Sequence, residues 1–467
     1  MKPIAAAVRD RPADQTPASS AHTHARAARP DPRRRLLSRA ALAAAVAGGG
    51  AACAGPVVNA TPADARRAGG ASRGEAVPPE APKRAPGRER DARPPTSPAE
   101  WLLHPGERSI DVPDDYLGLH SDHGFRDDTP APTYRYDAIR SLNAHDKDGY
   151  PLLHWDMIER EPGRYDWRHL DRWLELHPGR TRIWVLFGCP PFYQKYPGER
   201  WHWPYRPGGG SPPRDPEAAA AMVAALLARH PRAFRFVELW NEPNFGWDER
   251  SLREGRWHPA SGRPGYFTGT PADLAALARA VRKVLPPQVR LLSGAWEGQW
   301  RDPGPSNSLL RFARAPDGAG GLGRDHVQAL SAHSYMHGPD PNTMIAVLKG
   351  YRDMFARAGF APGLERHLSE CGAEAPYAWT RSRPAAPQRR AAILRWIVVP
   401  AALGWRSAYL YKHSLLETLG DPARDPAVAD AIDEGREMVV GRRIVAAARL
   451  DDGRIWLHFA SGADAVI

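Results

Sequence analysis

Two glutamates stand where their carboxylates could do chemistry. Glu242 ends the apolar run of "FVELWNEPNF", residues 236–245, and Glu370 ends that of "LERHLSECG", which begins at residue 364. Both runs read as strands, and a strand that served packing alone would more often end in Gly, Asn or Asp turn residues. One carboxyl group can act as a general acid while a second attacks as a nucleophile, provided that their surroundings hold one neutral and the other ionised. We therefore take these residues as a candidate acid/base and nucleophile pair.

Elements that could position this pair recur along the chain. Short apolar runs alternate with helical segments, and eight such runs are candidate strands. They begin near residues 116, 137, 182, 234, 289, 327, 364 and 406, and helices are predicted at 216–230, 271–285, 343–358 and 388–403. Thr270, Pro271 and Asp273 form a helix start with a capping hydroxyl, a proline and a carboxylate in the first turn. Eight alternations over roughly 300 residues favour a (β/α)8 TIM barrel over an open sheet.

Polar residues gather at the carboxyl ends of these predicted strands. They are His120 and Asp122, Arg140 and Asn143, Asn241 and Glu242, His333 and Tyr335, Glu370, and His413. The loops after the strands of a barrel converge on one face, so this placement supports the barrel. Glu242 closes the fourth strand and Glu370 the seventh, on opposite walls, so both can face one cleft. Cleavage of a glycosidic bond with retention needs two carboxyl groups about 5 to 5.5 Å apart.

Neighbouring residues could tune this pair. Arg140 and Tyr335 could both donate to Glu370 and hold it anionic, and Asn241 could contact a sugar hydroxyl. Glu238 shares a face with Trp240 and is predicted to be a buried structural partner of a barrel arginine. In that alternative Arg140 would have a structural role only. Glu297, after the fifth strand, is a rival catalytic carboxylate.

A family resemblance agrees with this interpretation. "LWNEPN" at residues 239–244 resembles the acid/base motif of glycoside hydrolase clan A, most closely that of family 39 and its relatives. "WDMIEREPGRYDWRHLD" at 155–171, "YFTGTPADLAALARAVRKV" before the fifth strand, "SAHSY" and "HLSECG" are similar to further segments of that group, with Ser369 in place of the usual Thr. The resemblance spans about residues 110–460. It implies a barrel glycosidase with Glu242 as acid/base and Glu370 as nucleophile, and it needs no cofactor.

The same resemblance and the aromatic residues suggest contacts for a carbohydrate substrate. Aromatic faces stack on sugar rings, and several tryptophans fall in loops after strands. The predicted substrate-binding residues are Arg140, Asn241, His333, Tyr335, Trp155, Trp296 and Tyr411. Many relatives carry a sugar-stacking Trp at the end of the eighth strand, where this chain reads "YLYKHS", so Tyr411 or His413 must serve there.

Metal and disulfide chemistry receive little support. His120, His333 and His413 lack the helical or loop spacing of a zinc site, so no metal is expected. Of the three cysteines, Cys53 lies in the leader. Cys189 and Cys371 are expected to be small buried residues, and their spacing does not decide whether they pair.

The charge distribution argues against nucleic-acid binding. The chain of 467 residues has a net charge of +11. Residues 1–100 carry 17 Lys or Arg against 9 Asp or Glu, a net charge of +8, which leaves 47 against 44 for the remainder. A phosphate-binding face needs positive charge on the folded surface, and here that surface is nearly balanced.

The amino-terminal hundred residues read as an export signal and a linker. Arg33–Arg39 precede an apolar stretch, 40–47, and small residues around Cys53. The stretch is too short for a permanent transmembrane anchor. Arg34 and Arg35 loosely resemble a twin-arginine signal, and lipid attachment at Cys53 is disfavoured because Gly50 stands where a lipoprotein signal prefers Leu. We predict an export signal at 1–54, a disordered linker at 55–108, a catalytic barrel at 109–440 and a β extension at 441–467, with an exported, periplasmic or extracellular location.

The sequence therefore predicts a retaining β-glycosidase that acts on an oligo- or polysaccharide. Relatives by resemblance include β-xylosidases, iduronidases and hydrolases encoded with bacterial exopolysaccharide systems, and the export signal favours the last group. Two alternatives remain open. One is a catalytically silent sugar-binding barrel in polysaccharide assembly, and the other is a transglycosylase that uses the same two glutamates.

Overall fold

A computed structural model describes residues 98–120, 134–142, 151–197, 208–245, 249–254, 265–300, 304, 306–336, 341–373, 385–411 and 425–467. The predicted export signal, Cys53 and most of the predicted linker lie outside these ranges, as do Asp122, Asn143 and His413. No helix in the described ranges is long and apolar enough to cross a membrane.

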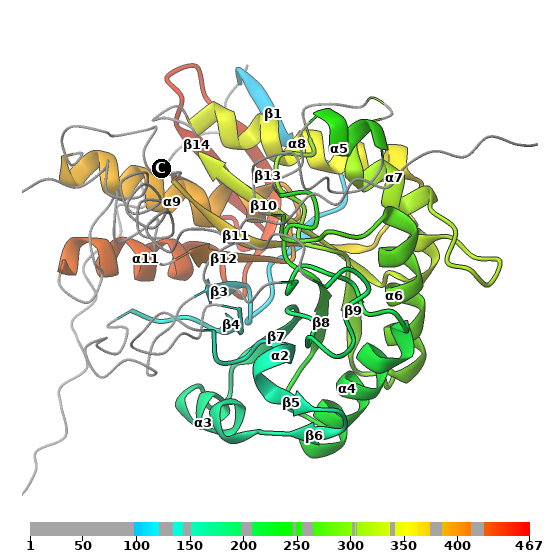
Figure 1. The fold of residues 1–467 in the computed structure, drawn as a ribbon. Helices are drawn as coiled ribbons and strands as arrows, with labels where there is room; N and C mark the ends of the chain where they lie inside the picture. Colours follow the sequence, from blue (N-terminus) through cyan, green and yellow to red (C-terminus); the bar gives the residue numbers. More distant parts are fainter. Residues whose placement is uncertain are drawn as a thin grey trace, which may run out of the picture. The chain divides into compact units, whose positions relative to one another are not determined.

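Eight parallel strands close a barrel, as the sequence predicts (Figure 1). Its strands neighbour one another in the order β10–β11–β12–β3–β4–β7–β8–β9. Their bounds are β3 Leu117–His120, β4 Ala138–Arg140, β7 Thr181–Leu186, β8 Phe236–Leu239, β9 Arg290–Leu292, β10 Ala329–Met336, β11 Glu365–Ala373 and β12 Ser407–Tyr411. Each of the eight predicted apolar runs overlaps one of these strands. The (β/α)8 fold is therefore confirmed.

Helices follow the strands and cover the outside of the barrel (Figure 1). They are α3 Arg168–Leu176, α4 Pro216–Arg229, α5 Glu249–Glu254, α6 Pro271–Val284, α7 Ser308–Arg314, α8 Pro341–Ala358, α9 Ala386–Ala402 and α11 Pro426–Val439. The start of α6 is a capping box, in which Asp273 N–H donates to Thr270 Oγ1 at 3.1 Å and Thr270 N–H donates to Asp273 Oδ2 at 2.9 Å. The helix start predicted there is confirmed.

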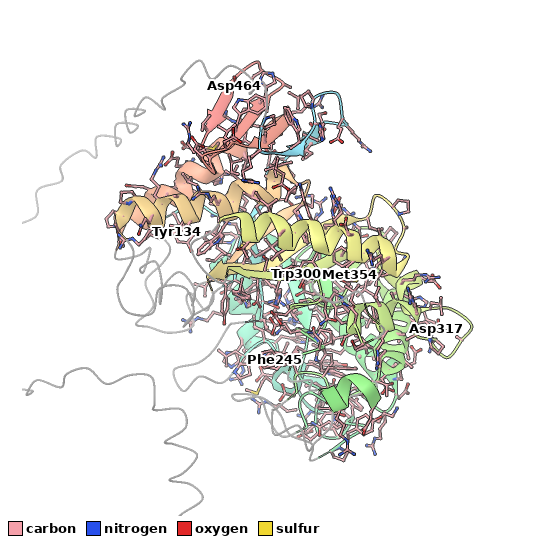
Figure 2. The ribbon with its side chains drawn as sticks, turned by 90° about the horizontal axis from the view of Figure 1, so that it is seen from above. Tyr134, Phe245, Trp300, Asp317, Met354 and Asp464 are labelled. Carbon is pink, nitrogen blue, oxygen red and sulfur yellow. The ribbon has the colours of Figure 1, made fainter. Side chains whose placement is uncertain are left out.

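Two smaller sheets accompany the barrel, one inserted between β4 and β7 and one formed by the segments before and after the barrel sequence. A short helix α2, Trp155–Ile158, leads into a hairpin of β5, Glu159–Glu161, and β6, Arg164–Tyr165. A separate antiparallel sheet has the order β1–β13–β14–β15, with β2 also paired to β13. Its strands are β1 Glu100–Leu103, β2 Ile110–Asp111, β13 Arg443–Arg449, β14 Ile455–Phe459 and β15 Asp464–Val466. In Figure 2, Asp464 on this sheet lies well apart from Phe245 on the barrel.

Strand β1 corrects the predicted linker. The linker was expected to run to residue 108, but Glu100–Leu103 forms a strand that pairs antiparallel with β13. Leu102 and Leu103 are buried there, and Lys349 on α8 donates to Glu100 Oε1 at 2.5 Å and to the Trp101 carbonyl at 3.2 Å. A four-residue strand whose partner lies more than 300 residues away has no recognisable pattern in the local sequence. The linker boundary was therefore set from composition alone and was placed too far along the chain.

The two body cysteines are free and buried in the structure. Cys189 Sγ lies 3.6 Å from the Pro190 carbonyl, and Cys371 Sγ lies 3.3 Å from the Tyr409 carbonyl. Burial raises the pKa of both thiols, so neither is poised as a thiolate. Both behave as small core residues, as the sequence predicts.

Candidate active site

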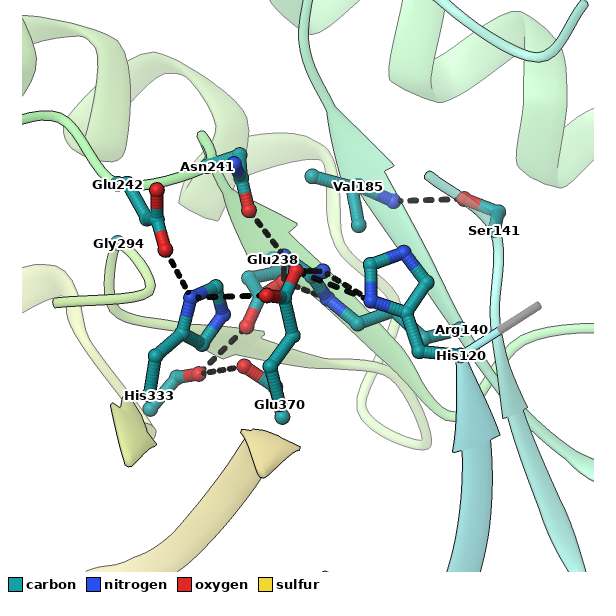
Figure 3. Close-up of polar contacts among 12 residues, drawn as sticks. His120, Arg140, Ser141, Val185, Glu238, Asn241, Glu242, Gly294, His333 and Glu370 are labelled. Atoms are coloured by element: carbon teal, nitrogen blue, oxygen red, sulfur yellow. Dashed lines mark hydrogen bonds and ion pairs between the residues drawn. The ribbon is translucent and has the colours of Figure 1, made fainter. Parts of the chain in front are cut away.

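Five of the predicted site residues meet at the carboxyl ends of the barrel strands, namely Arg140, Asn241, Glu242, His333 and Glu370 (Figure 3). Arg140, at the end of β4, lies at the centre and is completely buried. Its guanidinium donates to Glu238 Oε2 at 2.6 Å, to Glu370 Oε1 at 2.6 Å and to Asn241 Oδ1 at 2.7 Å. Sequence reasoning left open whether Arg140 pairs with the nucleophile or with a structural acid. It does both, because the planar guanidinium presents several donors in a fixed fork.

A bulge in β11 aims Glu370 into the mouth of the barrel. Ala332 of β10 is opposite Leu368, but the next residue, His333, is opposite Glu370, so Ser369 is an extra residue on β11. Ser369 Oγ bonds to Ser331 Oγ at 2.7 Å inside the barrel. In a regular strand, adjacent residues point to opposite faces, and the bulge instead lets Ser369 and Glu370 both face inward.

Glu242 sits on a turn with unusual backbone angles. Trp240 has φ +74° and Glu242 has φ +39°, both in the left-handed region that non-glycine residues rarely adopt. Such conformations cluster at functional sites and persist because the surrounding structure holds them. Here Trp240 Nε1–H donates to the Tyr266 carbonyl at 2.7 Å. Across the turn, a Cβ on Gly294 would come within 2.9 Å of Pro243 Cγ, so the segment after β9 needs a glycine beside the turn.

The two catalytic candidates lie close together. One carboxylate oxygen of Glu242, one of Glu370 and a ring nitrogen of His333 all lie within 4.8 Å of one another. His333 Nδ1 is 2.6 Å from Glu242 Oε1 and 3.4 Å from Glu370 Oε2, so the imidazole bridges them. The carboxyl groups therefore meet across the barrel mouth, as the sequence predicts. The same spacing could also hold a cation, and the expectation that no metal is needed stays a prediction.

The surroundings of Glu370 favour its anion. Burial by itself raises the pKa of Glu370, but His333, His120 and Arg140 outweigh it and lower the pKa well below its ordinary value. Burial lowers the pKa of both His120 and His333 to about 4, so near pH 7 both rings are neutral and Arg140 supplies the fixed positive charge. His120 Nδ1 lies 3.0 Å from Glu370 Oε1.

Tyr335 donates its hydroxyl to the other oxygen of Glu370, Oε2. Burial raises the pKa of Tyr335 well above its ordinary value, and the nearby charge of Glu370 acts in the same direction. The phenol therefore stays protonated and keeps donating. Glu370 thus accepts from donors on both oxygens, as expected of a carboxylate that must stay ionised.

Residues around the constellation have several different roles. Glu238 is fully buried between Arg140 and the Ser331 hydroxyl, as predicted for a structural acid. Glu297 is half-buried, and its backbone bonds to the Asn244 side chain beside the acid/base turn. Tyr411 is partly exposed, with its ring 5.0 Å from that of His120 and 6.0 Å from that of Tyr335. Tyr411 therefore borders the site, where a sugar contact was predicted.

The predictions for Trp155 and Trp296 as stacking residues are wrong. Trp155 is 0% exposed and Trp296 is 1% exposed. The Trp155 indole donates to Glu159 Oε2 at 2.6 Å and stacks on Tyr193. Trp296 packs against Phe312, and only its backbone carbonyl serves the site, accepting from His333 N–H at 2.9 Å. Both rings have their faces covered by protein, so no sugar can stack on them.

No protein-family model matches the chain, and no curated protein sequence does. Similar solved structures include a glucosidase from Croceicoccus marinus, with 15% identity, a TM-score of 0.46 and coverage of 77% of each chain. A GH30 endoxylanase from Clostridium papyrosolvens has 11% identity and a TM-score of 0.46, covering 77% of this chain and 81% of its own.

A third similar structure is xylanase 10B from Thermotoga maritima, with 12% identity, a TM-score of 0.44 and coverage of 70% of this chain and 95% of its own. All three bear names of glycoside hydrolases. At these values they assign neither a family nor a substrate to this chain, and the resemblance to family 39 stays a prediction. The function has to follow from the geometry of the site.

Proposed function

We propose that this protein is a retaining O-glycosyl hydrolase that cleaves β-glycosidic bonds, with Glu370 as nucleophile and Glu242 as acid/base. One observation carries the proposal: an oxygen of Glu242 and an oxygen of Glu370 lie within 4.8 Å of each other. Retaining enzymes hold their carboxyl groups about 5 to 5.5 Å apart, whereas inverting enzymes leave about 6.5 to 9.5 Å for a water molecule. The short separation fits direct attack by one carboxylate.

The first step forms a covalent intermediate. Glu370, kept anionic by Arg140 and Tyr335, attacks the anomeric carbon, while Glu242 gives its proton to the departing glycosidic oxygen. The bond from the anomeric carbon to Glu370 forms as the bond to the leaving oxygen breaks. In the second step Glu242 takes a proton from water, which attacks the same carbon and releases Glu370.

His333 supports the change of role that this sequence requires. At 2.6 Å, His333 Nδ1–H can donate to Glu242 Oε1, which leaves the other carboxyl oxygen of Glu242 to carry the proton for the leaving oxygen. With its pKa lowered to about 4 by burial, the ring is neutral near pH 7, and in the tautomer with its proton on Nδ1 it donates to Glu242 whether that carboxyl group is protonated or ionised. The same contact therefore serves Glu242 as acid and as base.

We further propose an oligo- or polysaccharide substrate, and an exopolysaccharide in particular, met outside the cytoplasm. This rests on the predicted export signal and on the aromatic residues bordering the barrel face. Secretion is tested by determining the mature amino terminus of the protein recovered from the native host's periplasm and medium. An uncleaved protein confined to the cytoplasm would contradict it.

The decisive experiment is a panel of aryl β-glycosides and bacterial polysaccharides assayed with wild type, Glu242→Ala and Glu370→Ala. Both variants should lose hydrolysis, and added azide should rescue Glu370→Ala as a glycosyl azide of inverted configuration. Activity should persist in EDTA. Glu297→Ala is the matched control and should remain active without azide.

Each alternative gives a different result. Azide rescue at Glu297 instead of Glu370 would overturn the assignment. A silent sugar-binding barrel would hydrolyse nothing and would bind oligosaccharide equally well before and after Glu370→Gln. A transglycosylase would yield products longer than the substrate when acceptor sugar is abundant.

A further inference from the structure

Phe245 is one of two large apolar side chains that the described part of the chain exposes. It is 36% exposed, and the other, Leu176, is 41% exposed. Single exposed apolar residues are common and need no explanation by themselves. What sets Phe245 apart is its place, three residues after the proposed acid/base.

The Phe245 ring is held in a fixed position relative to Glu242. Phe245 N–H donates to the Glu242 carbonyl at 2.8 Å, which closes a turn containing the proposed acid/base. The ring stacks on Tyr266, with centroids 4.4 Å apart and planes at 21°. The Tyr266 carbonyl in turn accepts from Trp240 Nε1 at 2.7 Å, so the residues before and after Glu242 are tied to the same support.

Leu176 has no comparable setting. It is the last residue of α3, and the carbonyl of Leu174, two residues earlier, accepts from Arg182 at the start of β7 at 3.3 Å. This is the amino-terminal face of the barrel, opposite the face where barrel chemistry gathers. Leu176 therefore provides a matched exposed apolar residue that the site does not use.

We propose that Phe245, backed by Tyr266, is the platform on which a sugar ring of the leaving group stacks. This rests on the proposed function, in which Glu242 protonates the oxygen that joins the leaving group to the cleaved sugar. The glycosidic oxygen that Glu242 protonates is bonded to the leaving sugar, so that sugar must lie beside Glu242. Phe245 is the aromatic side chain in the turn that contains Glu242. A neutral aromatic face of this kind selects a pyranose ring rather than a small alcohol.

The proposal is tested on the second half of the reaction. Once an aryl leaving group has departed, the leaving-group position is empty, and an acceptor can enter and attack the glycosyl–Glu370 ester. Its hydroxyl proton passes to Glu242, its oxygen bonds to the anomeric carbon, and the bond to Glu370 breaks. The ratio of transfer to hydrolysis therefore reports how well an acceptor binds at this position.

The experiment uses the 4-nitrophenyl β-glycoside that wild type hydrolyses best. The acceptors are methanol and the methyl β-glycosides of glucose, xylose and galactose. Phe245→Ala should lower the ratio of sugar transfer to hydrolysis about tenfold, as expected for the loss of one stacking contact. Transfer to methanol, which is too small to stack, should not change, and Phe245→Tyr should restore sugar transfer. Leu176→Ala should match wild type with every acceptor.

The outcomes separate this inference from the proposed function. Equal sugar transfer by wild type and Phe245→Ala would overturn the platform while leaving the glycosidase intact. Transfer by wild type to methanol but to none of the sugars would also overturn it. If wild type hydrolyses no glycoside in the panel, the proposed function itself fails, and the platform falls with it.

Discussion

The two ends of the barrel both contain shared ion pairs, buried at the mouth and partly exposed at the base, with opposite balances of charge. At the mouth, one arginine, Arg140, is shared by two carboxylates, Glu238 and Glu370. At the opposite end, one carboxylate, Asp115, is shared by Arg235 and Arg406.

This difference gives a physical reason for placing the proposed reaction at the mouth. At the mouth the carboxyl groups outnumber the one fixed cation, so one of these groups can hold a proton. Glu242, within 4.8 Å of Glu370, adds a further carboxyl group. At the other end the surplus of cations keeps the acid ionised. Burial would raise the pKa of Asp115, but the bond from Thr181 and the two arginines lower it. The mouth can exchange protons, and the base of the barrel is built for stability.

The largest effect expected is on activity, from amide replacements at the two ends. Glu370→Gln should reduce kcat by about 10⁴-fold or more, as loss of a nucleophile does, with little change in stability. Asp115→Asn should leave kcat within about twofold and should reduce the free energy of unfolding by about 1 kcal/mol, since its partners are partly exposed. Steady-state kinetics and urea unfolding measure both. Equal losses of activity would remove the distinction between the two ends.

Arginine replacements should show the contrast in stability. Arg140→Met leaves Glu238 and Glu370 buried without their cation and should cost about 3 to 5 kcal/mol of unfolding free energy. Arg406→Met should cost about 1 kcal/mol, because Asp115 stays in partial contact with water and Arg235 remains beside it. Urea titration of the two variants gives the comparison. A larger loss at Arg406 would show that the base, and not the mouth, depends on its arginine.

The pH dependence of stability should reflect the neutral histidines of the mouth. A histidine with a pKa lowered to about 4 stabilises the fold fully above pH 6.5, and this stabilisation is lost as pH falls from 6.5 to about 4. For His120 and for His333, the resulting loss of unfolding free energy should be about 3 kcal/mol each. His367, at the other end, is shifted in the same direction. His120→Asn should reduce the slope of unfolding free energy against pH in this window. A flat profile between pH 7 and 4.5 would show that these rings are not buried neutral.

Tyrosine-to-phenylalanine replacements should give the smallest contrast. Tyr335→Phe removes a donor to the Glu370 anion and should lower kcat/KM about 10- to 100-fold. It should also move the acidic limb of the pH–activity profile upward, since a carboxylate with fewer donors protonates at higher pH. Tyr116→Phe is the matched control, because that hydroxyl donates to the Ile397 carbonyl at 2.7 Å outside the site. It should change stability and leave the profile in place. An unshifted profile in Tyr335→Phe would mean that the phenol does not hold the anion.

The sequence predicted the barrel and the central constellation because both depend on local patterns. Apolar runs ending in polar residues mark the strands and the face at which they end, and this brought Arg140, Asn241, Glu242, His333 and Glu370 together. The same pattern could not show that a single extra residue, Ser369, turns Glu370 inward. That depends on the register against β10, which is a tertiary property.

The aromatic residues were the weakest part of the prediction. Position after a strand does not determine whether a ring faces the cleft or the protein. Trp155 is covered by Tyr193 and Trp296 by Phe312, partners that neither segment reveals. Phe245 escaped notice although it directly follows the motif, because exposure is set by the packing of Tyr266, which lies 21 residues further along.

Gly294 has a consequence for how this sequence can vary. A methyl group there would meet the Pro243 ring at 2.9 Å and the Leu239 carbonyl at 3.1 Å. Positions 243 and 294 should therefore vary together: in an alignment of homologues, any sequence that keeps the proline should keep the glycine, and an alanine at 294 should occur only where the proline has been lost. The space beside the proposed acid/base therefore depends on a pair of residues in the segments that follow two neighbouring strands, β8 and β9.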